Sequence, residues 1–293
     1  MQHASILRST LRPSAWLAGL CLAGLGLATL LAAGPVRAGG DALRAVIDGP
    51  HRSEAFRARD EYRHPFETLQ FFRVRPTMTV VEIWPGGGWY TEILAPYLRD
   101  GGTYYAAHFP SDSEVDYFRR GLAGFEAKMA AAPELYGEVN LVAFDPAQGA
   151  LTVPDGSADR VLTFRNVHNW LRNDGEQAAF DLFFKALKPG GILGVVEHRG
   201  KPGIDRETML STGYMDEESV IALATNAGFV LDGRSDINAN LRDTKDHPQG
   251  VWTLPPSLRL GDQNRERYQA IGESDRMTLR FRKPENGAAP ARD

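Results

Sequence analysis

The chain has 293 residues, a formal net charge of −4 at pH 7 and a single cysteine, and 43% of its residues are hydrophobic. The acidic balance argues against nucleic acid as a partner, because proteins that bind nucleic acid present a basic face to the phosphates. The length suits one large domain with a full hydrophobic core.

The first 38 residues have the pattern of a secretory leader. A basic start with Arg8 and Arg12 precedes an uncharged apolar run, Leu17 to Gly34, and Val36 and Ala38 occupy the positions that a signal peptidase reads. We therefore expect cleavage after Ala38 and a periplasmic or secreted protein. A retained N-terminal anchor is the alternative, because the apolar run approaches the roughly 20 residues of a membrane-spanning helix.

Cleavage after Ala38 also removes Cys21, the only cysteine. The mature protein then has no disulfide, no thiolate nucleophile and no cysteine-ligated metal. Its formal charge becomes −7, from 30 Lys and Arg against 37 Asp and Glu. No later segment is long and apolar enough to predict a membrane span.

Residues 39–76 are predicted to form an N-terminal helical extension, because Phe66, Leu69 and Phe72 recur at roughly helical spacing after a charged stretch. From residue 77 to residue 283, strands and helices alternate, which indicates βαβ units. We expect a Rossmann-like, doubly wound α/β domain with a mostly parallel, seven-stranded sheet. The expected strands are 78–83, 103–107, 139–144, 160–164, 192–197, 229–231 and 277–281, and the expected helices are 90–98, 117–129, 176–187 and 219–227.

Two segments interrupt this alternation. Residues 241–271 contain prolines and polar residues, which predict a long loop or lid before the last strand. Its charged part, Arg242 to Trp252, is a candidate substrate cap, although such loops are more often simply solvated. The tail 284–293 is rich in Pro, Gly and Ala and is expected to be disordered.

The sharpest functional signal is the sequence Val80 to Thr91, in which an acid ends a strand and a glycine-rich turn leads into a helix. Glycines allow a tight turn and a close approach of ligand, and the helix start offers unpaired N–H groups. Ligands of open α/β sheets bind at the carboxyl ends of the strands, where the strand order reverses. A dinucleotide site fits poorly, because Thr91 follows Gly86-x-Gly88 and the second strand ends at His108 rather than an acid.

This stretch resembles the first motif of the class I S-adenosylmethionine-dependent methyltransferases. The resemblance covers about Thr77 to Ala227, and its details are most similar to a group of secreted or periplasmic predicted methyltransferases. The later markers are Phe144-Asp145, residues 154–161, Asn166 to Trp170, and Leu187 to Leu193.

The resemblance implies S-adenosylmethionine as cofactor and transfer of its methyl group to an O, N or S nucleophile on a small molecule. It places Asp145 near the adenine and Asn166 near the methionine moiety. Two positions depart from the pattern, since Trp84 replaces the first glycine of the motif and His108 replaces the ribose-binding acid. The implied cofactor-binding residues are Glu82, Pro85, Gly86, Gly88, His108, Asp145 and Asn166.

A second group of polar residues is expected at the same edge of the sheet. His168 follows the fourth strand and Glu197 and His198 end the fifth, and in this topology the two strands are neighbours. A histidine beside a carboxylate can act as a general base. The same set can ligate a metal if His64 or His247 joins it, or it can simply pin loops through hydrogen bonds. His168, His198 and Glu197 are therefore the candidate catalytic residues, and no metal is expected.

Export raises an alternative function, because the methyl donor is made in the cytoplasm. An exported protein with a methyltransferase fold can instead bind a ligand, or act with a metal, without methyl transfer.

Overall fold

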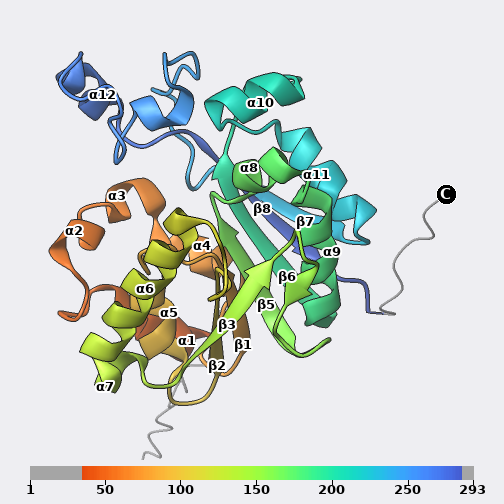
Figure 1. Ribbon diagram of the computed structural model, residues 1–293. Helices are drawn as coiled ribbons and strands as arrows, with labels where there is room; N and C mark the ends of the chain where they lie inside the picture. Colours follow the sequence, from red (N-terminus) through yellow and green to blue (C-terminus); the bar gives the residue numbers. More distant parts are fainter. Residues whose placement is uncertain (1–34, 286–293) are drawn as a thin grey trace, which may run out of the picture.

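The computed structural model describes residues 35–285, and an eight-stranded sheet with helices on both faces forms its centre (Figure 1). The strand order is β4-β3-β2-β1-β5-β6-β8-β7. The first five long strands are parallel, and β8 is antiparallel to both of its neighbours. The predicted doubly wound, mostly parallel α/β fold is therefore confirmed. The long strands are β1 (Thr79–Ile83), β2 (Thr103–His108), β3 (Val139–Asp145), β5 (Ala158–Phe164), β6 (Leu187–His198), β7 (Val230–Ser235) and β8 (Arg276–Arg282).

The sheet has one strand more than the seven predicted. The additional strand, β4 (Ala150–Leu151), pairs antiparallel with Phe144 and Asp145 at the end of β3. Two residues are too few to show the alternation by which a strand is recognised in a sequence. The hairpin extends the edge of the sheet next to the end of β3.

Strand β1 lies between β2 and β5, so the strand order reverses at its carboxyl end. Its side chains alternate between two cores, because Val81 and Ile83 pack on one face of the sheet and Val80 packs on the other. The first core is covered by α9 (Glu176–Ala186), which contributes the fully buried Phe180 and Phe183. Burial on both faces explains why Val80, Val81 and Ile83 are all apolar.

Four helices occupy residues 35–71 and cover the second core: α1 (Pro35–Ile47), α2 (Glu54–Arg57), α3 (Asp60–Arg63) and α4 (Pro65–Phe71). Leu43 and Leu69 are fully buried there. The predicted leader, 1–38, lies outside the described residues except for the first residues of α1. The predicted tail, 284–293, lies outside them from residue 286 onward.

The remaining described helices follow the strands, and they include no helix that could span a membrane. They are α5 (Thr91–Leu98), α6 (Asp116–Ala131), α7 (Pro133–Tyr136), α8 (Val167–Trp170), η1 (Leu171–Asn173), α10 (Arg206–Thr212), α11 (Glu217–Asn226), η2 (Gly250–Thr253) and α12 (Arg265–Ile271).

The segment 241–271 is held to the rest of the fold by the buried carboxylate of Asp243. This carboxylate accepts hydrogen bonds from the Tyr214 hydroxyl (2.8 Å), the ring Nε2 of His247 (2.9 Å) and the backbone N of Asp275 (2.8 Å). The charged loop is therefore pinned at its centre rather than merely solvated, although η2 and α12 are its only regular elements among the described residues.

Candidate functional site

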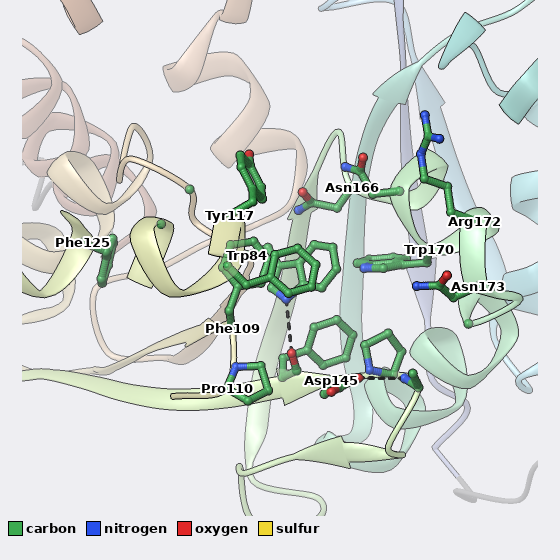
Figure 2. Close-up of a pocket in the computed structure, with 18 of the residues that line it drawn as sticks. Trp84, Phe109, Pro110, Tyr117, Phe125, Asp145, Asn166, Trp170, Arg172 and Asn173 are labelled. Atoms are coloured by element: carbon green, nitrogen blue, oxygen red, sulfur yellow. Dashed lines mark hydrogen bonds between the residues drawn. The ribbon is translucent and has the colours of Figure 1, made fainter. Parts of the chain in front are cut away.

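A cavity of about 780 Å³ opens at the carboxyl ends of β1, β2, β3 and β5 (Figure 2). Small-molecule sites commonly enclose about 300–1,000 Å³ and combine apolar walls with a few polar groups. The walls here are largely aromatic, and polar side chains lie at the rim. Its aromatic lining is Trp84, Phe109, Tyr117, Phe118, Phe125, Phe144 and Trp170, and its polar lining includes Asp145, Asn166, Asn169, Arg172 and Asn173.

The glycine turn forms one side of this cavity. Gly86 has a φ of +59°, and a Cβ placed on it would meet no atom within 4 Å. Gly88 has a φ of +81°, and a Cβ there would lie 3.3 Å from the ring of Phe125 on α6. Both positions need glycine for the backbone conformation itself. A side chain at Gly86 would therefore strain the turn as well as enter the cavity.

Trp84, which replaces the first glycine of the motif, is a wall of the cavity. Its φ of +45° is unfavourable for a bulky residue. Its indole Nε1 donates a hydrogen bond to the carbonyl of Phe144 (3.2 Å), and its ring lies 4.8 Å from that of Phe109 and 5.7 Å from that of Trp170. These contacts offset the strain and hold a large aromatic face at the sheet edge.

His108 lies behind the cavity wall. Its Nδ1 accepts the backbone N–H of Phe109 (2.8 Å), so Nε2 carries the proton and donates to the carbonyl of Gly86 (3.3 Å). Burial lowers the pKa of His108 to about 4, which keeps the ring neutral. The ring braces the glycine turn, and neither nitrogen is free for a ribose hydroxyl.

Glu82 is also buried away from the cavity. Its carboxyl group accepts hydrogen bonds from the hydroxyls of Tyr104 and Thr91. Burial raises the pKa of Glu82 to about 7, and those two hydrogen bonds oppose the rise. Glu82 therefore ties the end of β1 to α5 and β2. Of the seven residues predicted to bind the cofactor, Gly86, Asp145 and Asn166 line the cavity, whereas Glu82, Pro85, Gly88 and His108 do not.

Asp145 and Asn166 each present an unused oxygen at the cavity. The Oδ1 of Asp145 accepts the backbone N–H of Ala147 (2.9 Å) in its own turn, and Oδ2 accepts no hydrogen bond from any residue that the structure describes. The Nδ2 of Asn166 donates to the carbonyl of Ile83 (2.8 Å), which leaves its Oδ1 unpaired. The two oxygens can accept hydrogen bonds from a ligand.

Helix α6 forms a wall of the aromatic cavity that was not predicted from the sequence. Gly121 and Gly124, one helical turn apart, both line the cavity. A Cβ on Gly121 would lie 3.2 Å from the ring of Phe109, so this glycine allows the close approach of the helix, whereas a Cβ on Gly124 would meet nothing within 4 Å. Glycine inside a helix is less stable than alanine. The two glycines of this predicted helix were therefore the sequence signal that could have indicated a close approach or a cavity at α6.

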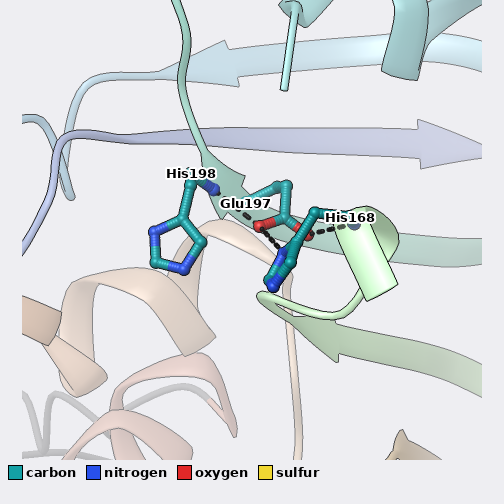
Figure 3. A group of neighbouring side chains, drawn as sticks. All are labelled: His168, Glu197 and His198. Atoms are coloured by element: carbon teal, nitrogen blue, oxygen red, sulfur yellow. Dashed lines mark hydrogen bonds and ion pairs between the residues drawn. The ribbon is translucent and has the colours of Figure 1, made fainter. Parts of the chain in front are cut away.

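His168, Glu197 and His198 meet at the ends of β5 and β6, as their strand positions predict (Figure 3). The Nδ1 of His168 donates to Oε1 of the fully buried Glu197 (3.0 Å), and the two histidine rings are 5.2 Å apart. Glu197 also accepts the backbone N–H groups of Val167 (2.6 Å) and His198 (2.8 Å). The carboxylate thus fixes the tautomer of His168 and leaves Nε2 without a hydrogen bond.

The surroundings of this group disfavour a metal ion. One ligand atom from each of the three residues falls within 4.8 Å of the others. However, the pKa of His198 is lowered well below its ordinary value by burial and then by His168, Arg276 and Arg165. Positive charges at this position repel a cation. His247 is bonded to Asp243 instead, and neither it nor His64 belongs to the group.

The turn after β5 lies between the aromatic cavity and the group of His168, Glu197 and His198. Asn166 lines the aromatic cavity, whereas Arg165 lines a small notch on the other side of the turn. Neither His168 nor His198 lines the aromatic cavity, and neither ring is bonded to a backbone carbonyl. The Nδ1 of His198 is hydrogen-bonded to the hydroxyl of Ser274 (2.5 Å). The aromatic cavity and the two histidines are therefore separate features of the same edge of the sheet.

No protein-family model matches the sequence, and no curated protein matches it. Solved structures do match the fold. An S-adenosylmethionine-dependent methyltransferase from Aquifex aeolicus is 16% identical, with a TM-score of 0.50 over 68% of this chain and 93% of that one. The [4+2]-cyclase SpnF is 19% identical, with a TM-score of 0.53 over 81% and 85% of the chains. An S-adenosylmethionine-dependent methyltransferase from Methanosarcina mazei is 13% identical, with a TM-score of 0.50 over 74% of this chain and 97% of that one.

These identities establish the fold alone, which is the Rossmann-like fold of the class I methyltransferases. The cyclase shows that solved structures of this fold also carry other activities. The function therefore has to be inferred from the residues at the edge of the sheet.

Proposed function

We propose that this protein is an S-adenosylmethionine-dependent methyltransferase acting on an O, N or S nucleophile of a small molecule. The observation that carries the proposal is the large aromatic cavity at the point of strand reversal, next to a histidine oriented by a buried carboxylate. The methyltransferases of the same fold support it.

The residues present fit the adenosyl part of the donor. The half-buried ring of Trp84 suits stacking with a purine, and the free oxygens of Asp145 and Asn166 suit donors on the ligand. The open space over Gly86 allows close approach of a ligand to the backbone. When bound, the donor supplies an electrophilic methyl group.

The catalytic work of this chain is then positioning and proton removal. The Nε2 of His168 accepts the proton that the nucleophile loses, and Glu197 stabilises the resulting imidazolium through Nδ1. Holding the acceptor in line with the methyl group of the donor also accelerates the reaction. The arginines near His198 argue against the metal-assisted alternative. A protein that binds the donor and never transfers its methyl group remains an outcome of the tests below.

Filling the cavity from α6 tests donor binding. Gly124→Phe places a ring where a Cβ meets no neighbour, and every residue except proline is a better helix former than glycine. Titration calorimetry is expected to show donor binding by the wild type and at least about tenfold weaker binding by the variant, or about 1.4 kcal/mol. Ala123→Phe, on an exposed position of the same helix, is the control and should bind like the wild type. Equal binding by both variants would place the donor elsewhere.

We further propose that the protein is exported and cleaved after Ala38. The mature chain would begin at Gly39, whose carbonyl accepts a hydrogen bond from the Tyr97 hydroxyl (3.0 Å), and it would retain the buried Leu43. Mass spectrometry of the protein from the cell envelope is expected to give Gly39 as its first residue. An uncleaved N-terminus in the membrane fraction would favour the anchor.

A further inference from the structure

Four arginines from distant parts of the chain gather behind the β5 turn, on the side away from the aromatic cavity. Arg59 and Arg63 come from the N-terminal helices, Arg165 follows β5, and Arg276 begins β8. Ion pairs with Glu273 join Arg59, Arg63 and Arg276, and Arg165 lines the same notch as Arg63 and Arg276. Arg63 and Arg276 are only 4% and 2% exposed, so this positive charge is largely removed from water.

A single carboxylate serves three of these arginines. Glu273 accepts the Nε of Arg59 (2.5 Å) and the Nε of Arg63 (3.2 Å), and it also pairs with Arg276. Although burial alone raises the pKa of Glu273, the arginines hold it well below its ordinary value. Within the described part of the chain, the guanidinium of Arg165 forms no ion pair or hydrogen bond. The cluster therefore has more positive than negative charge.

Several donors in the cluster are unused. Nη2 of Arg63 and Nε of Arg276 are buried without a hydrogen-bond partner among the described residues. Burial, followed by Arg276, lowers the pKa of Arg165 to about 10, as expected for a guanidinium that lacks a partner. Burying unpaired donors and unbalanced charge is unfavourable. A bound anion would accept hydrogen bonds from the unpaired donors and would balance part of the positive charge.

The space between these groups is small. A notch of about 10 Å³ is lined by Arg63, Arg165, Arg276 and Asn238, with the stacked rings of Tyr90 and Phe164 as its flat wall. That volume holds a group about the size of one water molecule. One oxygen of a carboxylate fits that space, whereas a tetrahedral phosphate is larger.

The notch adjoins the candidate catalytic histidines. Val196 also lines it, and side chains two residues apart on a strand point to the same face, so His198 projects on the notch side of β6. An anion held here would place the remainder of its molecule next to the two histidine rings, at the sheet edge.

We propose that this arginine notch binds a carboxylate of the methyl acceptor, so that the substrate is a small carboxylic acid whose nucleophile lies beside His168 and His198. The proposal rests on the proposed function. Arg165 is the residue that most depends on the ligand, because its guanidinium has no hydrogen-bond or ion-pair partner within residues 35–285.

Thermal unfolding of the full mature chain in acetate, phosphate or chloride at constant ionic strength tests the notch without donor or turnover. Acetate is expected to raise Tm with the logarithmic dependence on concentration of a single site, by about 3–6 °C at a tenfold excess over its Kd. Arg165→Met should abolish this response and leave Tm without acetate at or above that of the wild type, because it removes a positive charge that lies beside Arg63 and Arg276. Arg165→Lys should retain part of the response. Arg57→Met, which removes an exposed arginine, is the matched control and should respond like the wild type.

Three results would overturn the proposal: no rise in Tm with acetate, an equal rise in Arg165→Met, or a larger rise with phosphate or chloride than with acetate. Because donor binding is measured separately, the outcomes are distinguishable. An acetate response without donor binding would leave an acid-binding protein and remove the methyltransferase. Donor binding without an acetate response would leave the methyltransferase and remove the acidic acceptor.

Discussion

Replacing His168 by glutamine is expected to slow methyl transfer by about 100- to 10,000-fold while the Kd for the donor stays unchanged. Glutamine removes the proton-accepting Nε2, whereas the donor cavity does not include this residue. The rate is measured as release of the demethylated donor with a panel of small carboxylic acids that carry O, N or S nucleophiles.

His247→Gln is the matched control for this experiment. His247 is likewise buried and paired with a carboxylate, Asp243, at 2.9 Å, but it lies in the pinned loop outside the site. Its replacement should lower stability and leave the rate per folded molecule nearly unchanged. If both variants lose only stability, His168 has a structural role alone and its assignment as a base is wrong.

Replacing Glu82 by glutamine is expected to stabilise the protein at neutral and alkaline pH. The pKa of Glu82 is raised from an ordinary value of 4.5 to about 7 in the folded state. Such a group stabilises the fold most below pH 4.5, and this contribution is lost as pH rises to 7. At pH 8 the loss amounts to about 3 kcal/mol, from about 1.4 kcal/mol per pKa unit. Glutamine still accepts from Tyr104 and carries no charge.

Urea unfolding from pH 4 to pH 8 measures this effect. The gain in unfolding free energy from Glu82→Gln should be small at pH 4, grow up to pH 7 and then level off. Glu126→Gln, at an exposed position on α6, should change the unfolding free energy little at any pH. A constant difference across the range would mean that Glu82 titrates normally in the folded protein.

The strands were predictable because buried parallel strands are continuous apolar runs bounded by turn residues. The start of β6 was not predictable in this way, since residues 188–191, between the expected helix 176–187 and the expected strand 192–197, belong to β6. The backbone N–H of Gly190 donates to the carbonyl of Lys283, and that of Lys283 donates to the carbonyl of Gly191. This pairing joins residues more than 90 positions apart. A local pattern of glycine and proline does not contain such long-range information.

For the site, topology was predictable and side-chain direction was not. The meeting of His168 with Glu197 follows from the adjacency of β5 and β6. The orientation of His108 depends on hydrogen bonds to the neighbouring backbone, which strand position alone does not specify. The arginine cluster unites residues from three separate segments, each of which is an ordinary charged position in its own stretch of sequence.

The aromatic cavity also gives the protein an optical property. Trp84 and Trp170 lie edge to face with ring centroids 5.7 Å apart, close enough for their excited states to couple. Such a pair contributes a near-ultraviolet circular dichroism signal that depends on the angle between the indoles, here 65°. A purine inserted beside them would change that signal and quench their emission. The unlabelled protein thus contains its own spectroscopic probe at the place where a nucleoside is expected to bind.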